Sequence, residues 1–482
     1  MAFRAPPPRP DPLNWSSTQK HTILAIVMSL YAFPYPVLDH VEWTPAQLDR
    51  RIPPASPPPA VASPRTSSPA ALILGTVMAL ASTIGAALAP TYPSYMAARF
   101  FQGLGVSPAS NVGLAIINDT FFEHERGQKL GLWVLAIDQG LYFGPLIGGF
   151  VGSAGDRWIQ WLSAILFGVI LLAELFFLPE TLYPRHLMLK ATHGVGIIST
   201  TAQLGDEKSM IADCASQTPN KHAELRRTKK LPFANVAPLP GIRHPALYDT
   251  IIRFVKTFKY IVVPVSIITY CFGWYWWVLS VVTVVPIAYE TFSAQSQGLL
   301  YLGLIVGTVI SEVLFSGSLS DWIVIRQAKS NNGQKTPEMR LWLAYPAAVL
   351  TAVGLVVWGV SVDRGYHWMV GQVAFALFGA GIQMGNTAVC SYVVDAYPMQ
   401  SMATMTFYAV MLNLSAFVDP FFIVPWVENV GFTWTFAGHA IVTALFCIPV
   451  LAVLHRFGAA MRGKSGSPTW VNPEFEQTTA AS

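Results

Sequence analysis

The sequence predicts an all-α membrane protein of two helical bundles with about eleven transmembrane helices, the amino-terminal bundle being incomplete. Three observations predict this class. Apolar residues make up 53% of the 482 residues and charged residues only 12%, about half the charged share of soluble domains. The apolar residues gather in runs of about 20, the length that crosses a bilayer. Lysine and arginine are concentrated in alternate loops, as in membrane proteins with many spans.

Eleven apolar runs are candidate membrane spans. The first is marginal because Pro34 and Pro36 interrupt it, and it is no signal peptide because no small-residue cleavage site follows it. The candidate spans are His21–Leu38, Ala71–Ala89, Tyr95–Ile117, Leu130–Val151, Ile159–Leu178, Tyr260–Ala288, Leu299–Leu319, Leu341–Val360, Trp368–Val394, Ala403–Val427 and Phe432–Leu454.

A long polar segment separates the fifth run from the sixth and divides the chain. We expect a cytoplasmic tail at 1–20, an amino-terminal bundle at 21–179, a cytoplasmic central loop at 180–257, a six-helix bundle at 258–455 and a second cytoplasmic tail at 456–482.

Loop charges predict the orientation, because the cytoplasmic side keeps the excess of lysine and arginine. The opposite loops together hold only Arg157 and Arg364. The basic residues expected in the cytoplasm include Lys221, Arg226, Arg227, Lys229, Lys230, Arg326, Lys329, Lys335, Arg340, Arg456, Arg462 and Lys464.

One crossing is missing between the first run and the second. A basic head places the amino terminus in the cytoplasm, yet the run from Ala71 must also enter from the cytoplasm. The residues between, 39–69, form a Pro-rich linker, and prolines crowd its second part, Arg50–Pro69. Proline supplies neither the donors nor the dihedral angles of a helix, so we expect this linker outside the bilayer. Either the first run does not span, or a second span has been lost.

Two local patterns combine glycine with polar residues or proline. The third run holds R-x-x-Q-G-x-G, and the fourth holds G-x-x-x-G-P-x-x-G-G. Glycines four residues apart form a stripe that lets a neighbouring backbone approach closely, either for rocking of two helices or for static packing. The residues are Arg99, Gln102, Gly103 and Gly105 in the first pattern, and Gly140, Gly144, Pro145, Gly148 and Gly149 in the second.

These patterns resemble the major facilitator superfamily, in particular its fungal drug:proton antiporter-like branch. Supporting matches begin at Asp11 (D-P-L-N-W-S), Leu178 (L-P-E-T) and Gly317 (G-S-L-S-D). The resemblance covers nearly the whole chain from Ala71 and implies a transporter of two parallel six-helix halves with its site near the membrane midplane. The second span and the gating motif that follows it in the family, G-x-L-A-D-R-x-G-R-K, are apparently missing.

Arg99 and Asp138 are ionisable residues inside apolar runs of the amino-terminal half. Arg99 and Asp138 each fall within several Å of the membrane midplane by helical rise, where an unpaired charge is costly. We expect an Arg99–Asp138 pair that senses or carries a proton; the alternative is a permanent structural ion pair. The resemblance supports Arg99 better than Asp138.

Charges at the cytoplasmic helix ends resemble the gating charges of the family. They are Glu125 and Arg126 before the fourth run, and Asp321 and Arg326 after the seventh. A solvated surface would explain them equally well.

Substrate contacts are expected from polar and aromatic residues inside the carboxyl-terminal spans. Tyr270 and Trp274 belong to an aromatic run in the sixth stretch, and Gln383 and Asn386 are amides in an apolar frame. Flat apolar or cationic ligands favour such walls, whereas core packing and hydrogen bonds between helices are the alternatives.

The function expected from these features is proton-coupled efflux of a small organic molecule such as a drug, toxin or secondary metabolite. An uptake permease for a cationic nutrient is the nearest alternative, and a damaged chain that inserts without transporting is another. No zinc-protease, hydrolase, Walker or Rossmann motif occurs. We therefore expect no enzyme, cofactor, metal or nucleic-acid partner, and a monomer in the plasma membrane or, alternatively, the vacuolar membrane.

Overall fold

The computed structural model describes residues 17–32, 69–120, 123–178, 247–316, 318–331, 333–397 and 400–466. The linker expected at 39–69, apart from Pro69, and most of the central loop lie outside these residues, so those expectations stay predictions. Every regular element in the described ranges is a helix, which confirms the expected all-α fold.

Five helices precede residue 180 in the described part of the chain. Each corresponds to one of the first five apolar runs. They are α1 (Ser17–Ala32), α4 (Pro69–Leu88), α5 (Tyr92–Thr120), α6 (Glu123–Gly152) and α7 (Asp156–Phe177).

In the carboxyl-terminal half, the described residues form six long spans, and three of these include a π-helical turn. Pro337–Leu343 is a 3-10 turn that leads into its span. The elements are α11 (Val262–Tyr270), η3 (Cys271–Tyr275) and α12 (Trp276–Ala288); α13 (Ala294–Leu300), α14 (Leu302–Ser311) and η4 (Glu312–Ser316); α15 (Ser318–Ser330); η5 (Pro337–Leu343) and α16 (Ala344–Asp363); α17 (Trp368–Ala396); α18 (Ser401–Val430); and α19 (Phe432–Val442), η7 (Thr443–Cys447) and α20 (Ile448–Ser465).

Eight helices in the described residues are long and apolar enough to cross a membrane. Six are the spans of the carboxyl-terminal half, and two are Gly131–Gly152 and Arg157–Phe177. Leu72–Leu88 in α4 is a shorter apolar helix. The other two expected runs form α1 and α5; α1 has only 16 residues, or about 24 Å, less than the hydrocarbon thickness.

A short helix before the sixth apolar run falls where the sequence indicated only loop. α10 (Leu247–Thr257) occupies the end of the expected central loop. Its Phe254 stacks on Phe407 of α18 with ring centroids 5.1 Å apart, and Phe258 meets the same ring edge-on at 5.0 Å. Apolar side chains on one face of this segment therefore hold it against the bundle.

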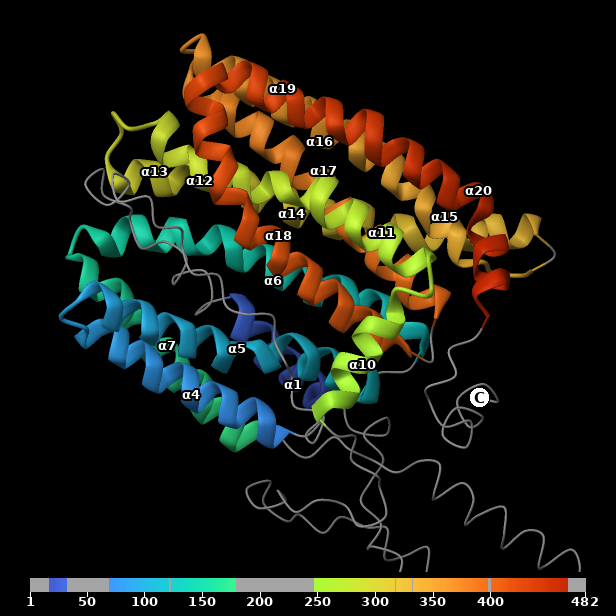
Figure 1. Cartoon of the computed structure of the whole chain (residues 1–482), viewed down its shortest axis with the longest axis horizontal. Helices are drawn as coiled ribbons and strands as arrows, with labels where there is room; N and C mark the ends of the chain where they lie inside the picture. The colour runs from blue at the N-terminus through green and yellow to red at the C-terminus, as the bar shows by residue number, and fades with distance from the viewer. Residues whose placement is uncertain are drawn as a thin grey trace, which may run out of the picture.

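The helices form two groups that meet along α6 (Figure 1). α1, α4, α5 and α7 lie together on one side, and the helices from α11 onward lie on the other. From the amino-terminal half, α6 contacts α13, α14, η4 and α17, and α5 contacts α18. Side chains on α6 therefore face elements that are more than 100 residues away in the sequence.

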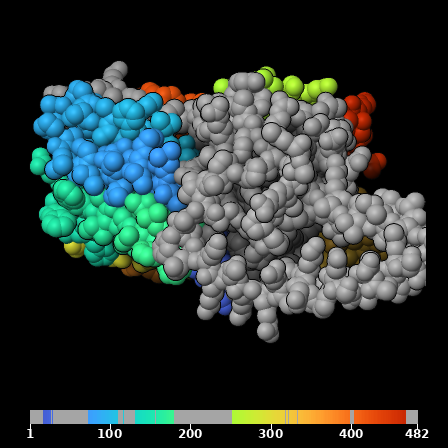
Figure 2. All heavy atoms as spheres, turned by 90° about the horizontal axis from the view of Figure 1, so that it is seen from below, coloured from blue at the N-terminus to red at the C-terminus, as the bar shows by residue number. Residues whose placement is uncertain are grey.

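The outer face of the amino-terminal half suits lipid. Figure 2 shows residues of α4, α5 and α7 side by side on this face. On α7, Ile165, Val169 and Leu172 are more than half exposed and recur at helical spacing, and Leu74 of α4 is 70% exposed. Neighbouring exposed apolar side chains are costly in water but not against acyl chains.

Candidate transport site

The antiporter-like pattern lies where the two halves touch most closely. A Cβ atom added at Gly149 would overlap the Ala294 carbonyl oxygen, and one added at Gly298 would lie 3.0 Å from the Pro145 carbonyl oxygen. Contacts between α6 and the α13–α14–η4 span continue inward at Gln139, which donates to Thr308 at 2.5 Å. Along these contacts the residue numbers decrease on α6 while they increase on the α13–α14–η4 span, so the two spans run antiparallel.

Asp138 of α6 makes hydrogen bonds across the boundary between the halves. Its carboxylate is fully buried, and it accepts hydrogen bonds from the Tyr275 hydroxyl at 3.2 Å and the Asn386 amide at 3.2 Å. Both donors belong to the carboxyl-terminal half, on η3 and α17. The Asn386 carbonyl oxygen accepts in turn from the Tyr408 hydroxyl of α18 at 2.8 Å. One carboxylate of α6 thereby organises side chains from three other helices.

A second carboxylate, Glu312, approaches the boundary from the other half. It accepts from the Gln383 amide at 2.7 Å and from the Thr387 hydroxyl at 3.2 Å, both on α17. A Cβ atom at Gly131 of α6 would overlap Glu312 Oε1, so the absence of a side chain there makes room for the carboxylate. Asn386 and Thr387 follow Gln383 by three and four residues, so each is a neighbour of Gln383 on the surface of α17.

Two π-helical turns coincide with these acidic groups. Tyr275, a partner of Asp138, is the last residue of η3, and Glu312 is the first residue of η4. Inserted π turns rotate the side chains that follow them and occur often at functional sites. The π turns η3 and η4 therefore help to position Tyr275 and Glu312 at the boundary.

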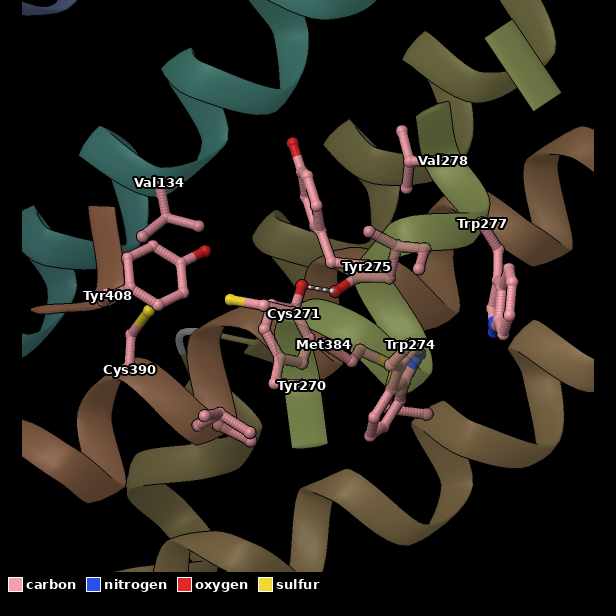
Figure 3. Close-up of a cluster of buried hydrophobic side chains, with 14 of the residues drawn as sticks. Val134, Tyr270, Cys271, Trp274, Tyr275, Trp277, Val278, Met384, Cys390 and Tyr408 are labelled. Atoms are coloured by element: carbon pink, nitrogen blue, oxygen red, sulfur yellow. Dashed lines mark hydrogen bonds between the residues drawn. The ribbon is translucent and has the colours of Figure 1, made fainter. Parts of the chain in front are cut away.

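Aromatic side chains surround the acidic groups. Tyr270 lies 5.9 Å from Tyr275 and 6.3 Å from Tyr408 between ring centroids. Figure 3 shows Tyr408 between Val134 of α6 and Cys390 of α17, with Tyr270 and Tyr275 nearby. Three of these rings carry hydroxyl groups, so the wall is both aromatic and able to hydrogen bond.

The four expected substrate contacts separate into two groups. Gln383 and Asn386 hold the two carboxylates, and Tyr270 belongs to the aromatic wall. Trp274 instead donates to the Thr351 hydroxyl of α16 at 2.9 Å and fills space left by Gly385. Its indole therefore packs inside the carboxyl-terminal bundle. The expected roles of all four in substrate binding stay predictions.

The expected pair of Arg99 with Asp138 is not formed in the described structure. Arg99 donates to Gln102 on its own helix at 3.2 Å, and Gln102 donates to the Thr83 hydroxyl of α4. A Cβ atom at Gly105 would overlap the backbone of α4 at Gly75. The first pattern thus fastens α5 to α4, whereas Asp138 faces the opposite half.

The expected gating charges are only partly described. Glu125 and Arg126 lie in the first turn of α6, and Asp321 lies in α15, but the side chains of these three are outside the described atoms. Arg326 places its guanidinium 5.1 Å above the Trp322 ring. Gating by these residues stays a prediction.

Sequence reasoning missed Glu312, Gln139 and Tyr408. Glu312 had a clear signal, because it is a lone carboxylate inside the apolar run Leu299–Leu319. Gln139 is an amide in an apolar run, as Gln383 and Asn386 are, but Tyr408 had no signal, since its importance comes from a partner on another helix.

The fold agrees with the comparison to known families. The family model of the Major Facilitator Superfamily matches residues 54–418, which is most of the chain. The chain belongs to this superfamily and is a multi-pass membrane transporter.

Several curated relatives of this chain are fungal efflux pumps. The chain is 26% identical over 373 residues to the "Probable efflux pump mfs2" of Aspergillus flavus, covering 77% of this chain and 82% of that protein. It is 28% identical over 394 residues to "Efflux pump FUB11" of Gibberella moniliformis, covering 80% of this chain but 61% of that protein. The chain is thus similar to fungal efflux pumps and spans less than two thirds of some of them.

Among solved structures, the chain is similar in fold to the proton:xylose symporter XylE bound to 6-bromo-6-deoxy-D-glucose. The TM-score is 0.56, the sequence identity is 14%, and the match covers 92% of this chain and 96% of that one. At this identity the likeness concerns the fold alone.

Proposed function

We propose that this chain exports a small organic molecule in exchange for protons, with Asp138 as the residue that carries the proton. The observation that carries the proposal is the position of Asp138. Its carboxylate is buried on a helix of one half, and its donors Tyr275 and Asn386 belong to the other half. Separation of the halves removes both donors and admits water, so proton binding and the contact between halves are linked.

The proposed cycle uses this linkage. A proton neutralises the Asp138 carboxyl group, which can then stay in the closed, water-poor boundary. When α6 separates from α17, water stabilises the carboxylate, and the proton leaves on the side that is open. Because the opening alternates between the two sides of the membrane, each cycle can move a proton one way and an organic molecule the other way.

Two observations support export of a drug, toxin or secondary metabolite. The antiporter-like pattern from Gly140 to Gly149 forms the close contact with α13, and relatives that match most of the chain are named efflux pumps. Export at the plasma membrane follows most directly from such a role. The charges expected at the cytoplasmic ends, Glu125, Arg126, Asp321 and Arg326, would bridge helices when the inner mouth closes.

Transport in reconstituted vesicles tests the proposal. Rhodamine 6G is loaded into vesicles with an imposed pH gradient, and its movement is followed by fluorescence. We expect Asp138→Asn to insert normally but to lose gradient-driven transport by about tenfold or more. Glu174→Gln is the matched control, because Glu174 is a buried carboxylate of α7 bonded to Thr76 of α4, away from the boundary. Wild-type rates in Asp138→Asn would remove Asp138 from the mechanism.

A further inference from the structure

Side chains of three helices form a closed polar ring across the boundary between the halves. Asp138 of α6 accepts from Asn386 of α17, and Gln383 lies one helical turn before Asn386 on the same face. Gln383 then donates to Glu312 of η4 at 2.7 Å. Each step is a hydrogen bond or one turn of helix, so the two carboxylates lie near each other.

The span that contains Glu312 also connects back to α6, through Thr308. Thr308 lies one turn before Glu312 on the same face, and it accepts from Gln139, the neighbour of Asp138 in the chain. Asp138 and Gln139 belong to the amino-terminal half, and the other members belong to the carboxyl-terminal half. Movement between the halves therefore opens the ring. We call this set the acidic ring; its members are Asp138, Gln139, Thr308, Glu312, Gln383 and Asn386.

The acidic ring has more acceptors than donors. Gln383 must turn its NH2 group to Glu312, because a carboxylate only accepts. Gln139 must turn its NH2 group to Thr308, whose own hydroxyl hydrogen goes to the Leu304 carbonyl at 2.8 Å. The carbonyl oxygens of both glutamines are left buried with no donor among the described residues. Buried acceptors without a partner are rare and point to a missing group.

Positive charge is missing as well. In the described structure no lysine, arginine or histidine side chain bonds to Asp138 or Glu312; their partners are amides and hydroxyls. The Tyr275 hydroxyl bonds to Asp138 and the Tyr408 hydroxyl bonds to Asn386, and Tyr270 lies within about 6 Å of both rings. Aromatic rings of this kind can also stabilise a bound cation. A ligand that supplies both N–H donors and positive charge would satisfy the two glutamine oxygens and compensate the two carboxylates.

We propose that the acidic ring recognises a protonated amine, so that the exported molecule carries a primary or secondary ammonium group. This inference rests on the proposed function, because it names the substrate class of the same site. The ammonium charge pairs with Asp138 and Glu312, and its N–H bonds reach the oxygens of Gln139 and Gln383. Protons and the amine then compete for the same carboxylates, and this competition couples their opposite movements.

Binding to the purified full-length protein in detergent tests the class of ligand. The probes share one body and differ in the head group: 2-phenylethylamine, its N,N,N-trimethyl derivative and 2-phenylethanol. A ligand that binds the folded state raises the unfolding temperature. We expect the amine to raise it most, the trimethyl cation less because it has no N–H donor, and the alcohol least. An equal effect of the amine and either analogue, or no effect of any probe, overturns the proposal.

Variants locate the binding. Glu312→Gln should weaken the amine about tenfold, whereas Glu174→Gln should bind it like the wild type. Gly131→Ala keeps every charge but displaces the Glu312 carboxylate, so it should weaken binding of the amine as well. Size-exclusion chromatography shows whether each variant is folded, and Gly131→Ala keeps the test decisive if Glu312→Gln is not. Unchanged amine binding in a folded Glu312→Gln or Gly131→Ala variant overturns the proposal.

The failure of this inference can be told apart from failure of the proposed function. Loss of gradient-driven transport in Asp138→Asn together with no preference for the amine overturns the substrate class alone. Selective amine binding without any transport driven by a pH gradient overturns proton coupling and leaves the substrate class in place.

Discussion

Asn386 is the residue that joins the two halves of the site. Its NH2 group donates to Asp138, and its carbonyl oxygen accepts from Tyr408 and from the Cys390 thiol. A single amide can fill these roles because it is both donor and acceptor, which neither a carboxylate nor an alkyl group can be. The sequence showed an amide in an apolar run, but its partners became visible only in the fold.

Replacement of Asn386 should therefore cost stability as well as transport. Asn386→Leu keeps the volume roughly but removes the donor to the Asp138 Oδ2 atom and the acceptor of the Tyr408 hydroxyl, at about 1–3 kcal/mol for each buried group, while Tyr275 still donates to Asp138 Oδ1. We expect a lower unfolding temperature in detergent and loss of transport. Asn413→Leu is the control, because Asn413 is a partly buried residue that bonds only within its own helix, to the Ala409 carbonyl. Equal unfolding temperatures in the two variants would contradict the bridging role.

At the scale of elements, α6 is the helix whose face decides most of the site. Gly149 and Pro145 touch α13, Asp138 reaches η3 and α17, and Gly131 faces Glu312. Positions 131, 138, 145 and 149 are about two turns or one turn apart, so a single stripe of the helix meets the other half. Glycine at both ends lets the backbones approach, and a carboxylate lies between.

A side chain at Gly149 should hold the two halves apart. A Cβ atom there meets backbone rather than a side chain that could rotate away, so α6 and α13 must separate. We expect Gly149→Val to reduce transport by about tenfold or more, while the protein still inserts. Gly168→Val on α7 is the matched control, because a Cβ atom at Gly168 has nothing within 4 Å. Full transport by Gly149→Val would show that close approach at this point is unnecessary.

At the scale of the whole molecule, the proposed cycle moves the two halves against each other. The closest contacts between them link α6 with α13, α14 and η4, and no peptide segment in the described residues connects these helices directly. Each half is packed internally, for example by Thr76 with Glu174 and by Trp274 with Thr351. In the proposed cycle, these internally packed halves would rock at their glycine-lined contact.

A disulfide across that contact should stop transport reversibly. A Cβ atom at Gly298 would lie 3.4 Å from the Leu146 Cα atom, so cysteines at both positions are close enough to bond. We expect Leu146→Cys with Gly298→Cys to form a disulfide on oxidation, to lose transport, and to regain it on reduction. Each single variant controls for the substitution itself. Transport by the oxidised, cross-linked protein would show that α6 and α13 need not separate.

The sequence by itself determined that this is a membrane protein, where its helices approximately lie and which family it belongs to. Apolar runs of bilayer length and local glycine patterns suffice for that, because they depend on neighbours within one helix. It also placed Asp138 and Arg99 inside spans. Only the tertiary structure decided that Asp138 meets Asn386, 248 residues away, and not Arg99. Partners across helices depend on how each helix is rotated and shifted against the next, and packing of the whole bundle sets both. Glu312 joined the site for the same reason, since a π turn and the missing side chain of Gly131 bring its carboxylate to the boundary.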